Sequence, residues 1–291
     1  MSPDGAPEVP GSRPRPQRPR LSPQALAAAR GGAREGLDWL GRPPESTAGL
    51  FVRLVVVAAR FVLFVIFRFR VTASGQENLP KGGGYLVVAA IHRGWMDPFL
   101  ILHALPTEPR AWFLGSGRST FSARWREWLL HRLGGMLPVW RGGVGVDQHV
   151  ASARAVLANG GVFVLVPEGG VAGPPDRPAT FRHGAALIAL RTGALIVPIA
   201  LAGADELYLG KRMASRILPP TSARDLLADW DRTLPADGSR EELDLARRLT
   251  DRFADILGPA VAAIYPGTVD PPERRRRWRG LTWLFLARRE R

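Results

Sequence analysis

The 291-residue chain lacks cysteine entirely, and of its 40 basic residues only Lys81 and Lys211 are lysine. The absence of cysteine excludes disulfides, thiolate metal sites and cysteine nucleophiles. The sequence also lacks an apolar run long enough to cross a bilayer. Its most hydrophobic segment, residues 49–71, has no uncharged stretch longer than seven residues, whereas a spanning helix needs about 20.

Two common catalytic signatures are missing as well. The chain contains no Gly-x-Ser-x-Gly elbow and no Gly-x4-Gly-Lys phosphate loop, which argues against a serine hydrolase and a P-loop nucleotidase. Apart from His92, the histidines are scattered without metal-ligand spacing, so we predict no metal site. They are His103, His131, His149 and His183.

The net charge of +14 is concentrated in two short segments. Residues 49–71 carry four arginines and no acid, and residues 273–291 carry eight basic and two acidic groups. Nucleic acid and anionic membrane both attract such surfaces. Because the arginines alternate with Phe and Leu in the first segment and lie among Phe, Leu and Trp in the second, we favour an anionic leaflet as the partner and expect no nucleic acid.

Residues 49–71 have the pattern of a helix lying in the membrane interface. At 100° per residue, Arg53, Arg60 and Arg68 fall within an arc of about 80°, opposite a broad apolar face. Such a helix buries its apolar face while the arginines reach the phosphates. The alternative is a core helix of a soluble domain.

We therefore divide the chain into four parts. Residues 1–48 are rich in Pro and Arg and are expected to be disordered. Residues 49–71 are the interfacial helical segment, residues 72–270 the catalytic domain, and residues 271–291 a basic, aromatic membrane-binding tail. For this tail the alternative is a solvated segment that binds nothing specific.

Strand-like and helix-like patterns alternate from residue 85 onward. This alternation predicts an α/β fold, a layered mixed sheet with flanking helices, preceded by the interfacial element. Strands are expected at residues 85–90, 111–114, 136–140, 162–166 and 195–201. Helices are expected at residues 98–105, 119–133, 147–159, 179–191 and 240–264. The role of residues 203–239 stays open.

A histidine follows the first of these strands. His92 comes two residues after the buried run Tyr85–Ala90, and Asp97-Pro98 then opens an apolar segment. Asp is a favoured N-cap and Pro a favoured first helical residue, so a helix is expected to begin here. The turn can bring His92 and Asp97 together as a general base and the group that orients it. The alternative is that Asp97 only caps its helix.

Four segments of the chain, in this order, resemble the four sequence blocks of the glycerolipid and lysophospholipid acyltransferase family. The His-x4-Asp block at residues 91–98 is followed by Gly135-Met136-Leu137-Pro138-Val139-Trp140-Arg141, by Val166-Pro167-Glu168-Gly169-Gly170 and by Ile196-Val197-Pro198-Ile199-Ala200. The likeness extends over about residues 50–265. It implies transfer of a fatty acyl group from an acyl-CoA or acyl carrier protein thioester to a lipid hydroxyl at the cytoplasmic face of the membrane, with no bound cofactor.

The resemblance also implies roles for individual residues. His92 would be the general base and Asp97 the group that orients it, while Arg141, Glu168 and Gly169 would belong to the blocks that bind the acceptor and organise the site. Arg182 is expected at the start of the helix after the Glu168 loop, pointing back toward that loop.

The chain departs from the family pattern at two positions. Ile91 precedes His92 where Asn is common, and Gly170-Val171 follows Glu-Gly where the family usually has Thr and Arg. That Arg is associated with the acceptor's phosphate. Either another arginine, from among Arg141, Arg177 and Arg182, covers its role, or the acceptor is not a simple lysophosphatidic acid. A glycolipid or aminolipid hydroxyl and a non-catalytic lipid-binding relative therefore stay open as alternatives.

Overall fold

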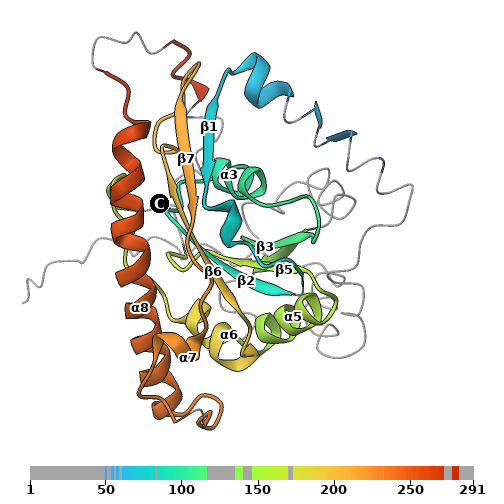
Figure 1. Cartoon of the computed structure of the whole chain (residues 1–291), viewed down its shortest axis with the longest axis vertical. Coiled ribbons are helices and arrows are strands. Elements are labelled where there is room, and N and C mark those ends of the chain that lie inside the picture. The colour runs from blue at the N-terminus through green and yellow to red at the C-terminus, as the bar shows by residue number, and fades with distance from the viewer. Residues whose placement is uncertain are drawn as a thin grey trace, which may run out of the picture.

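The structure, a computed structural model, contains one seven-stranded sheet with helices on both faces (Figure 1). It describes residues 50, 54–55, 57–58, 61–82, 84–116, 135–139, 146–169, 173–231, 233–271 and 277–281. The predicted helix at residues 119–133 and the proline-rich residues 1–48 lie outside these ranges.

The strands are β1 (Arg70–Ser74), β2 (Tyr85–Ala90), β3 (Ala111–Ser116), β4 (Met136–Val139), β5 (Val162–Leu165), β6 (Ile196–Ala202) and β7 (Arg212–Ile217). The α-helices are α3 (Met96–Ala104), α5 (Val146–Ala158), α6 (Gly184–Thr192), α7 (Ala223–Leu226) and α8 (Arg240–Ile264). The shorter helices are η1 (Phe61–Ile66), η2 (Gln76–Asn78) and η3 (Tyr265–Thr268).

The strand order is β1-β7-β6-β2-β5-β3-β4. From β6 to β4 all neighbours are parallel, whereas β7 runs antiparallel to β6. The predicted α/β fold with a layered mixed sheet is therefore confirmed. The central strand β2 is buried along its whole length, as expected for a parallel strand covered on both faces.

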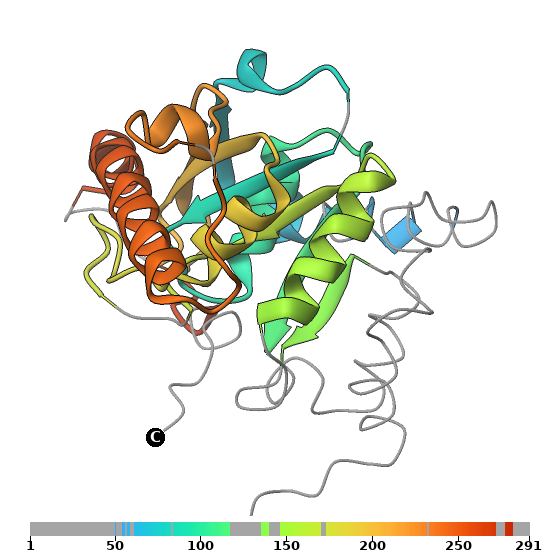
Figure 2. The same ribbon diagram turned by 90° about the horizontal axis from the view of Figure 1, so that it is seen from below.

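Alternate residues of β2 belong to two separate cores. Leu86, Val88 and Ala90 pack on one face with residues of α5, α6 and α8. Their neighbours Tyr85, Val87 and Ala89 pack on the other face with α3 and the N-terminal segment. Helix α6 contacts both α5 and α8 and lies between them (Figure 2). The sheet thus holds the end of β2 rigidly between two helical layers.

The N-terminal apolar segment is helical at its described residues as far as Ile66, and it rests on the second core. Its π-helix η1 buries Leu63, while Phe61 and Val65 face outward. The last residues of the predicted helical segment, Arg70 and Val71, instead begin β1. Among the described helices, none is long and apolar enough to span a membrane.

Two helices begin at other residues than predicted, and the region that the prediction leaves open contains two further elements. Helix α3 begins at Met96, so Asp97 lies in its first turn and is not the N-cap. Helix α6 begins at Gly184 and not at residue 179, because the preceding segment is bonded to the loop after β5: the Arg182 amide donates to Pro167 O at 2.8 Å. The unassigned residues 203–239 contain β7 and α7.

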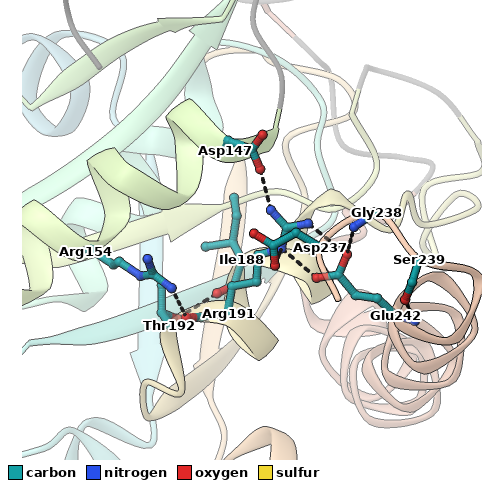
Figure 3. Close-up of polar contacts among 9 residues, drawn as sticks. All are labelled: Asp147, Arg154, Ile188, Arg191, Thr192, Asp237, Gly238, Ser239 and Glu242. Atoms are coloured by element: carbon teal, nitrogen blue, oxygen red, sulfur yellow. Dashed lines mark hydrogen bonds and ion pairs between the residues drawn. The ribbon is translucent and has the colours of Figure 1, made fainter. Parts of the chain in front are cut away.

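An ion-pair network fastens the helical layer at the amino-terminal edge of the parallel strands (Figure 3). Arg191, in the last turn of α6, donates to the buried Glu242 of α8 at 2.6 and 2.8 Å, and it also contacts Asp147 of α5. The Gly238 amide donates to Glu242 at 2.7 Å. The hydrogen bond from Arg191 lowers the pKa of Glu242, so these two residues form an ion pair between α6 and α8. The contact of Arg191 with Asp147 adds α5 to the network.

Candidate active site

The candidate site lies where two neighbouring parallel strands end. His92 follows β2, and Glu168 follows β5, which pairs with β2 in parallel. Carboxyl ends of parallel strands meet at one edge of a sheet, where α/β proteins place their active groups. The His92 amide accordingly donates to Glu168 Oε1 at 3.0 Å across a sequence separation of 76 residues.

His92 is held by the buried carboxylate of Asp97. The Nδ1 atom of His92 lies 2.8 Å from Asp97 Oδ2. The same oxygen accepts from the backbone amides of Arg93 at 2.5 Å and Gly94 at 2.8 Å. Gly94 has a φ of 144°, which glycine adopts readily. The carboxylate therefore closes the turn and also orients the ring.

This contact determines which nitrogen of His92 can act as a base. A carboxylate is an acceptor, so Nδ1 carries the proton and Nε2 presents a lone pair. Within the described part of the chain, Nε2 has no hydrogen-bond partner, and the side chain is 29% exposed. The pair thus has the geometry of a general base with its orienting group.

The charges around His92 act in opposite directions on its pKa. Burial of the ring lowers the pKa, but the hydrogen bond to Asp97 and the negative charges of Asp97 and Glu168 outweigh burial, so the pKa is raised overall. A raised pKa makes the imidazole a stronger base, which favours proton abstraction from a hydroxyl.

Glu168 is buried, with 5% of its surface exposed. Burial raises its pKa to about 7, although the hydrogen bonds from the amides of His92 and Ala179 (3.5 Å) oppose this shift. The carboxyl group therefore joins two loops, the turn after β2 and the segment before α6. Its contacts are those of a residue that organises the site.

Arg93 is a site residue that sequence reasoning missed. It is 8% exposed, and its guanidinium donates to the carbonyls of Gly173 (2.8 Å) and Pro174. It joins the turn after β2 to the loop after β5. The only signal in the sequence is its place next to His92, which does not distinguish it from the chain's many surface arginines.

Arg182 and Gly169 lie in contact, whereas Arg141 lies outside the described residues. Gly169 has a φ of 61°, and a Cβ atom built there would lie 2.6 Å from Arg182 Cδ. Arg182 is exposed and, although it precedes α6, its side chain points back over the Glu168 loop. Arg177 is exposed in the same loop. In the described ranges no three His, Asp or Glu side chains gather as a metal site.

Comparisons with known proteins agree with this geometry. The family model described as Acyltransferase matches residues 70–202, an interval that contains all four blocks. A curated 1-acyl-sn-glycerol-3-phosphate acyltransferase of Chlamydomonas reinhardtii is 28% identical over 191 residues, which cover 60% of this chain and 54% of that protein. Residues 70–202 therefore match the acyltransferase family, and the named relative is a glycerolipid acyltransferase. The resemblance of the sequence blocks is thereby confirmed.

A solved structure has the same fold as this acyltransferase domain. The 1-acyl-sn-glycerophosphate (LPA) acyltransferase PlsC from Thermotoga maritima matches with a TM-score of 0.54 at 20% identity, over 78% of this chain and 85% of that one. By contrast, the match to the Chlamydomonas protein spans only about half of its length.

One departure from the family pattern has a structural explanation. Ile91, which stands where Asn is common in this acyltransferase family, is 2% exposed and packs with Ala200, Ala260 and Val261. An apolar side chain suits this contact between β2, β6 and α8. The departure leaves the His92–Asp97 contact intact.

The raised pKa of Glu168 predicts a specific pH dependence of stability. Between pH 4.5 and about 7 the folded state keeps a proton that the unfolded state loses, so this group's contribution to stability falls as pH rises. A shift of this size corresponds to about 3 kcal/mol. We expect the unfolding free energy of Glu168→Gln, relative to wild type, to rise by that order between pH 5 and pH 8.

Urea denaturation at the two pH values measures this difference. If the Gln side chain destabilises the fold by an amount that does not depend on pH, that amount is the same at both values and cancels. Glu241→Gln is the matched control, because Glu241 is exposed on α8 and should give no such change. Parallel stability curves for wild type and Glu168→Gln would contradict the raised pKa.

Proposed function

We propose that this chain transfers a fatty acyl group from an acyl-CoA or acyl carrier protein thioester to a hydroxyl of a lysophospholipid such as 1-acylglycerol-3-phosphate. The observation that carries the proposal is the contact of His92 Nδ1 with Asp97 Oδ2 at 2.8 Å. A protein that only bound lipid would have no need of an oriented base. The name of the Chlamydomonas relative, a 1-acyl-sn-glycerol-3-phosphate acyltransferase, supports the acceptor class.

The chemistry needs one base and no covalent intermediate on the enzyme. Nε2 of His92 takes the proton of the acceptor hydroxyl as the oxygen attacks the thioester carbonyl, and Asp97 stabilises the resulting imidazolium. The tetrahedral intermediate then collapses, the C–S bond breaks, and the proton passes from His92 to the leaving thiolate. The products are an ester and a free thiol, and the base is regenerated.

Binding of the acceptor is assigned to Arg182, which follows the Glu168 loop, and to Arg141, at the end of the second sequence block. Glu168 holds the turn that carries His92. Because Gly169 has no side chain, the side chain of Arg182 can lie against its backbone. Arginine suits a phosphate monoester because its guanidinium offers several charge-assisted donors. With Val171 where the family has Arg, we assign that function to Arg182 together with Arg141.

We place the protein peripherally on the cytoplasmic face of the membrane, with residues 49–71 and 271–291 as contact segments. The supporting observation is a row of exposed apolar side chains at helical spacing in the first segment. They are Leu50, Leu54, Val57, Phe61 and Val65, each more than half exposed. Trp278, in the second segment, is 63% exposed, and such a ring suits the headgroup layer.

The catalytic assignment predicts that His92→Ala lowers kcat for acyl transfer by about 10²–10⁴-fold, the usual contribution of general-base catalysis. Asp97→Asn should also be severely impaired, because the amide can hold the wrong tautomer. The measurement is product formation from a labelled acyl donor and lysophospholipid vesicles. A purified His92→Ala protein that keeps most of the wild-type rate would rule out the base.

The acceptor assignment predicts that Arg182→Ala and Arg141→Ala each raise KM for a phosphate-bearing acceptor, with a smaller effect on a neutral lysolipid. The loss of one charge-assisted donor corresponds to roughly tenfold or more in KM. Arg224→Ala, an exposed change on α7, serves as the control. Equal losses on both acceptors would make these arginines structural. Activity on neutral acceptors alone would favour a glycolipid or aminolipid hydroxyl.

The membrane assignment predicts that deletion of residues 273–291 weakens binding to vesicles containing anionic lipid, and that the loss shrinks at high salt. Replacement of Phe61 and Val65 by Ser should weaken binding at every salt concentration, since apolar insertion is not screened. Vesicle co-sedimentation measures both effects. Complete release of the wild-type protein by salt alone would contradict apolar insertion.

A further inference from the structure

A small cavity lies next to Asp97, and the proposed catalytic steps do not involve it. It is lined by Ile91, Arg93, Asp97, Pro175 and residues 201–205 at the end of β6. Its volume open to the centre of a water molecule is about 10 Å³, close to the space that one buried water requires. The cavity thus brings the end of a third central strand, β6, next to the turn that contains Arg93 and Asp97.

Two carboxylates line the cavity, each with an oxygen that lacks a donor. All three donors to Asp97 converge on Oδ2. Its other oxygen, Oδ1, is buried and has no partner among the described residues, and the same holds for Oδ1 of Asp205. Asp97 is 1% exposed. A buried carboxylate oxygen without a donor is costly, so a donor is expected between them.

We propose that Asp205 is a positioning residue, which shares one bound water with Asp97 and thereby fixes the carboxylate that orients His92. A water molecule has two hydrogens, and it can donate one to Asp97 Oδ1 and the other to Asp205 Oδ1. The proposal rests on the catalytic role proposed for His92. It adds a residue after β6 to those supplied after β2 and β5.

The charges around the cavity are compatible with two ionised carboxylates. The guanidinium of Arg93 lines the same cavity, so its positive charge offsets their mutual repulsion. The charged groups that act on His92 are Asp97, Glu168 and Arg93. Asp205 is not one of these groups, so its effect on the ring is expected to act through the carboxylate of Asp97.

The shared water also restricts the rotation of Asp97. With only Oδ2 bound, the carboxyl group can turn about its Cβ–Cγ bond and exchange its two oxygens. With Oδ1 held as well, the oxygen that faces His92 Nδ1 keeps its place. Such support fixes the tautomer and orientation of a catalytic imidazole, as outer hydrogen bonds do for ligating histidines.

The test compares Asp205→Asn with Asp176→Asn. The two changes remove the same charge, but Asp176 is exposed beside Pro175 and does not line the cavity. We expect Asp205→Asn to lower kcat about tenfold with KM unchanged, a fraction of the 10²–10⁴-fold that general-base catalysis contributes. Asp176→Asn should retain the wild-type kcat.

A second readout does not depend on turnover. The pKa of His92, followed by NMR of the imidazole in protein without substrates, should fall in Asp205→Asn and stay unchanged in Asp176→Asn, because a merely structural residue would not move it. An unchanged His92 pKa in Asp205→Asn would overturn the proposal. If the pKa falls in Asp205→Asn while the wild-type protein transfers no acyl group, the proposed function fails and the coupling of Asp205 to His92 stands.

A high-resolution crystal structure of the wild-type protein tests the water directly and does not depend on how the variants fold. Density for one water within hydrogen-bond distance of Asp97 Oδ1 and Asp205 Oδ1 is the expected result. Direct contact between the two carboxyl groups, or a cavity filled by another side chain, would overturn the shared water.

Discussion

The site depends on the carboxylate of Asp97 more than on any other group. One oxygen of this side chain accepts from two backbone amides of the turn after β2 and from the ring of His92. The same contacts therefore shape the loop and select the imidazole tautomer. They are strong because the group is almost completely buried, where hydrogen bonds to a charged acceptor gain from the low local dielectric.

A second loop, the one after β5, is built around this turn. Glu168 accepts from the His92 amide and from Ala179, and the Arg93 guanidinium binds the carbonyl of Gly173. Each contact joins residues more than ten positions apart, so the loop is held by several independent attachments. This explains why α6 begins late. The Arg182 amide donates to Pro167 O, so it is not available for a helical turn that begins at residue 179.

The loop between β6 and β7 also joins segments that are distant in the sequence. The Gly210 amide donates to Phe67 O in the N-terminal segment, and the Leu209 amide donates to Arg277 O near the C-terminus. Glu206 pairs with Arg279 at 2.7 Å. The two segments with exposed apolar residues thus attach to one loop, which begins beside Asp97 and the turn after β2.

Sequence patterns alone determined most of the parallel core. The sequence predicts the buried strand Tyr85–Ala90 and the long amphipathic helix Arg240–Ile264 with their observed bounds, because burial on both faces or along one stripe leaves a clear pattern of apolar residues. The sequence also predicts the contact of His92 with Asp97, because only a short turn separates the two residues. Each of these predictions depends only on residues that lie close together in the sequence.

Tertiary structure alone decided the features that join distant parts of the chain. Strand β1, at one edge of the sheet, and its neighbour β7 both carry polar residues among apolar ones, and they are strands because β1 pairs with β7 and β7 also pairs with β6. The burial of Arg93, the contact of Glu168 with the His92 amide and the meeting of Asp97 with Asp205 at one cavity arise in the same way. Parallel strands bring their carboxyl ends to one edge regardless of sequence separation, and no periodicity along the chain records which side chains meet there.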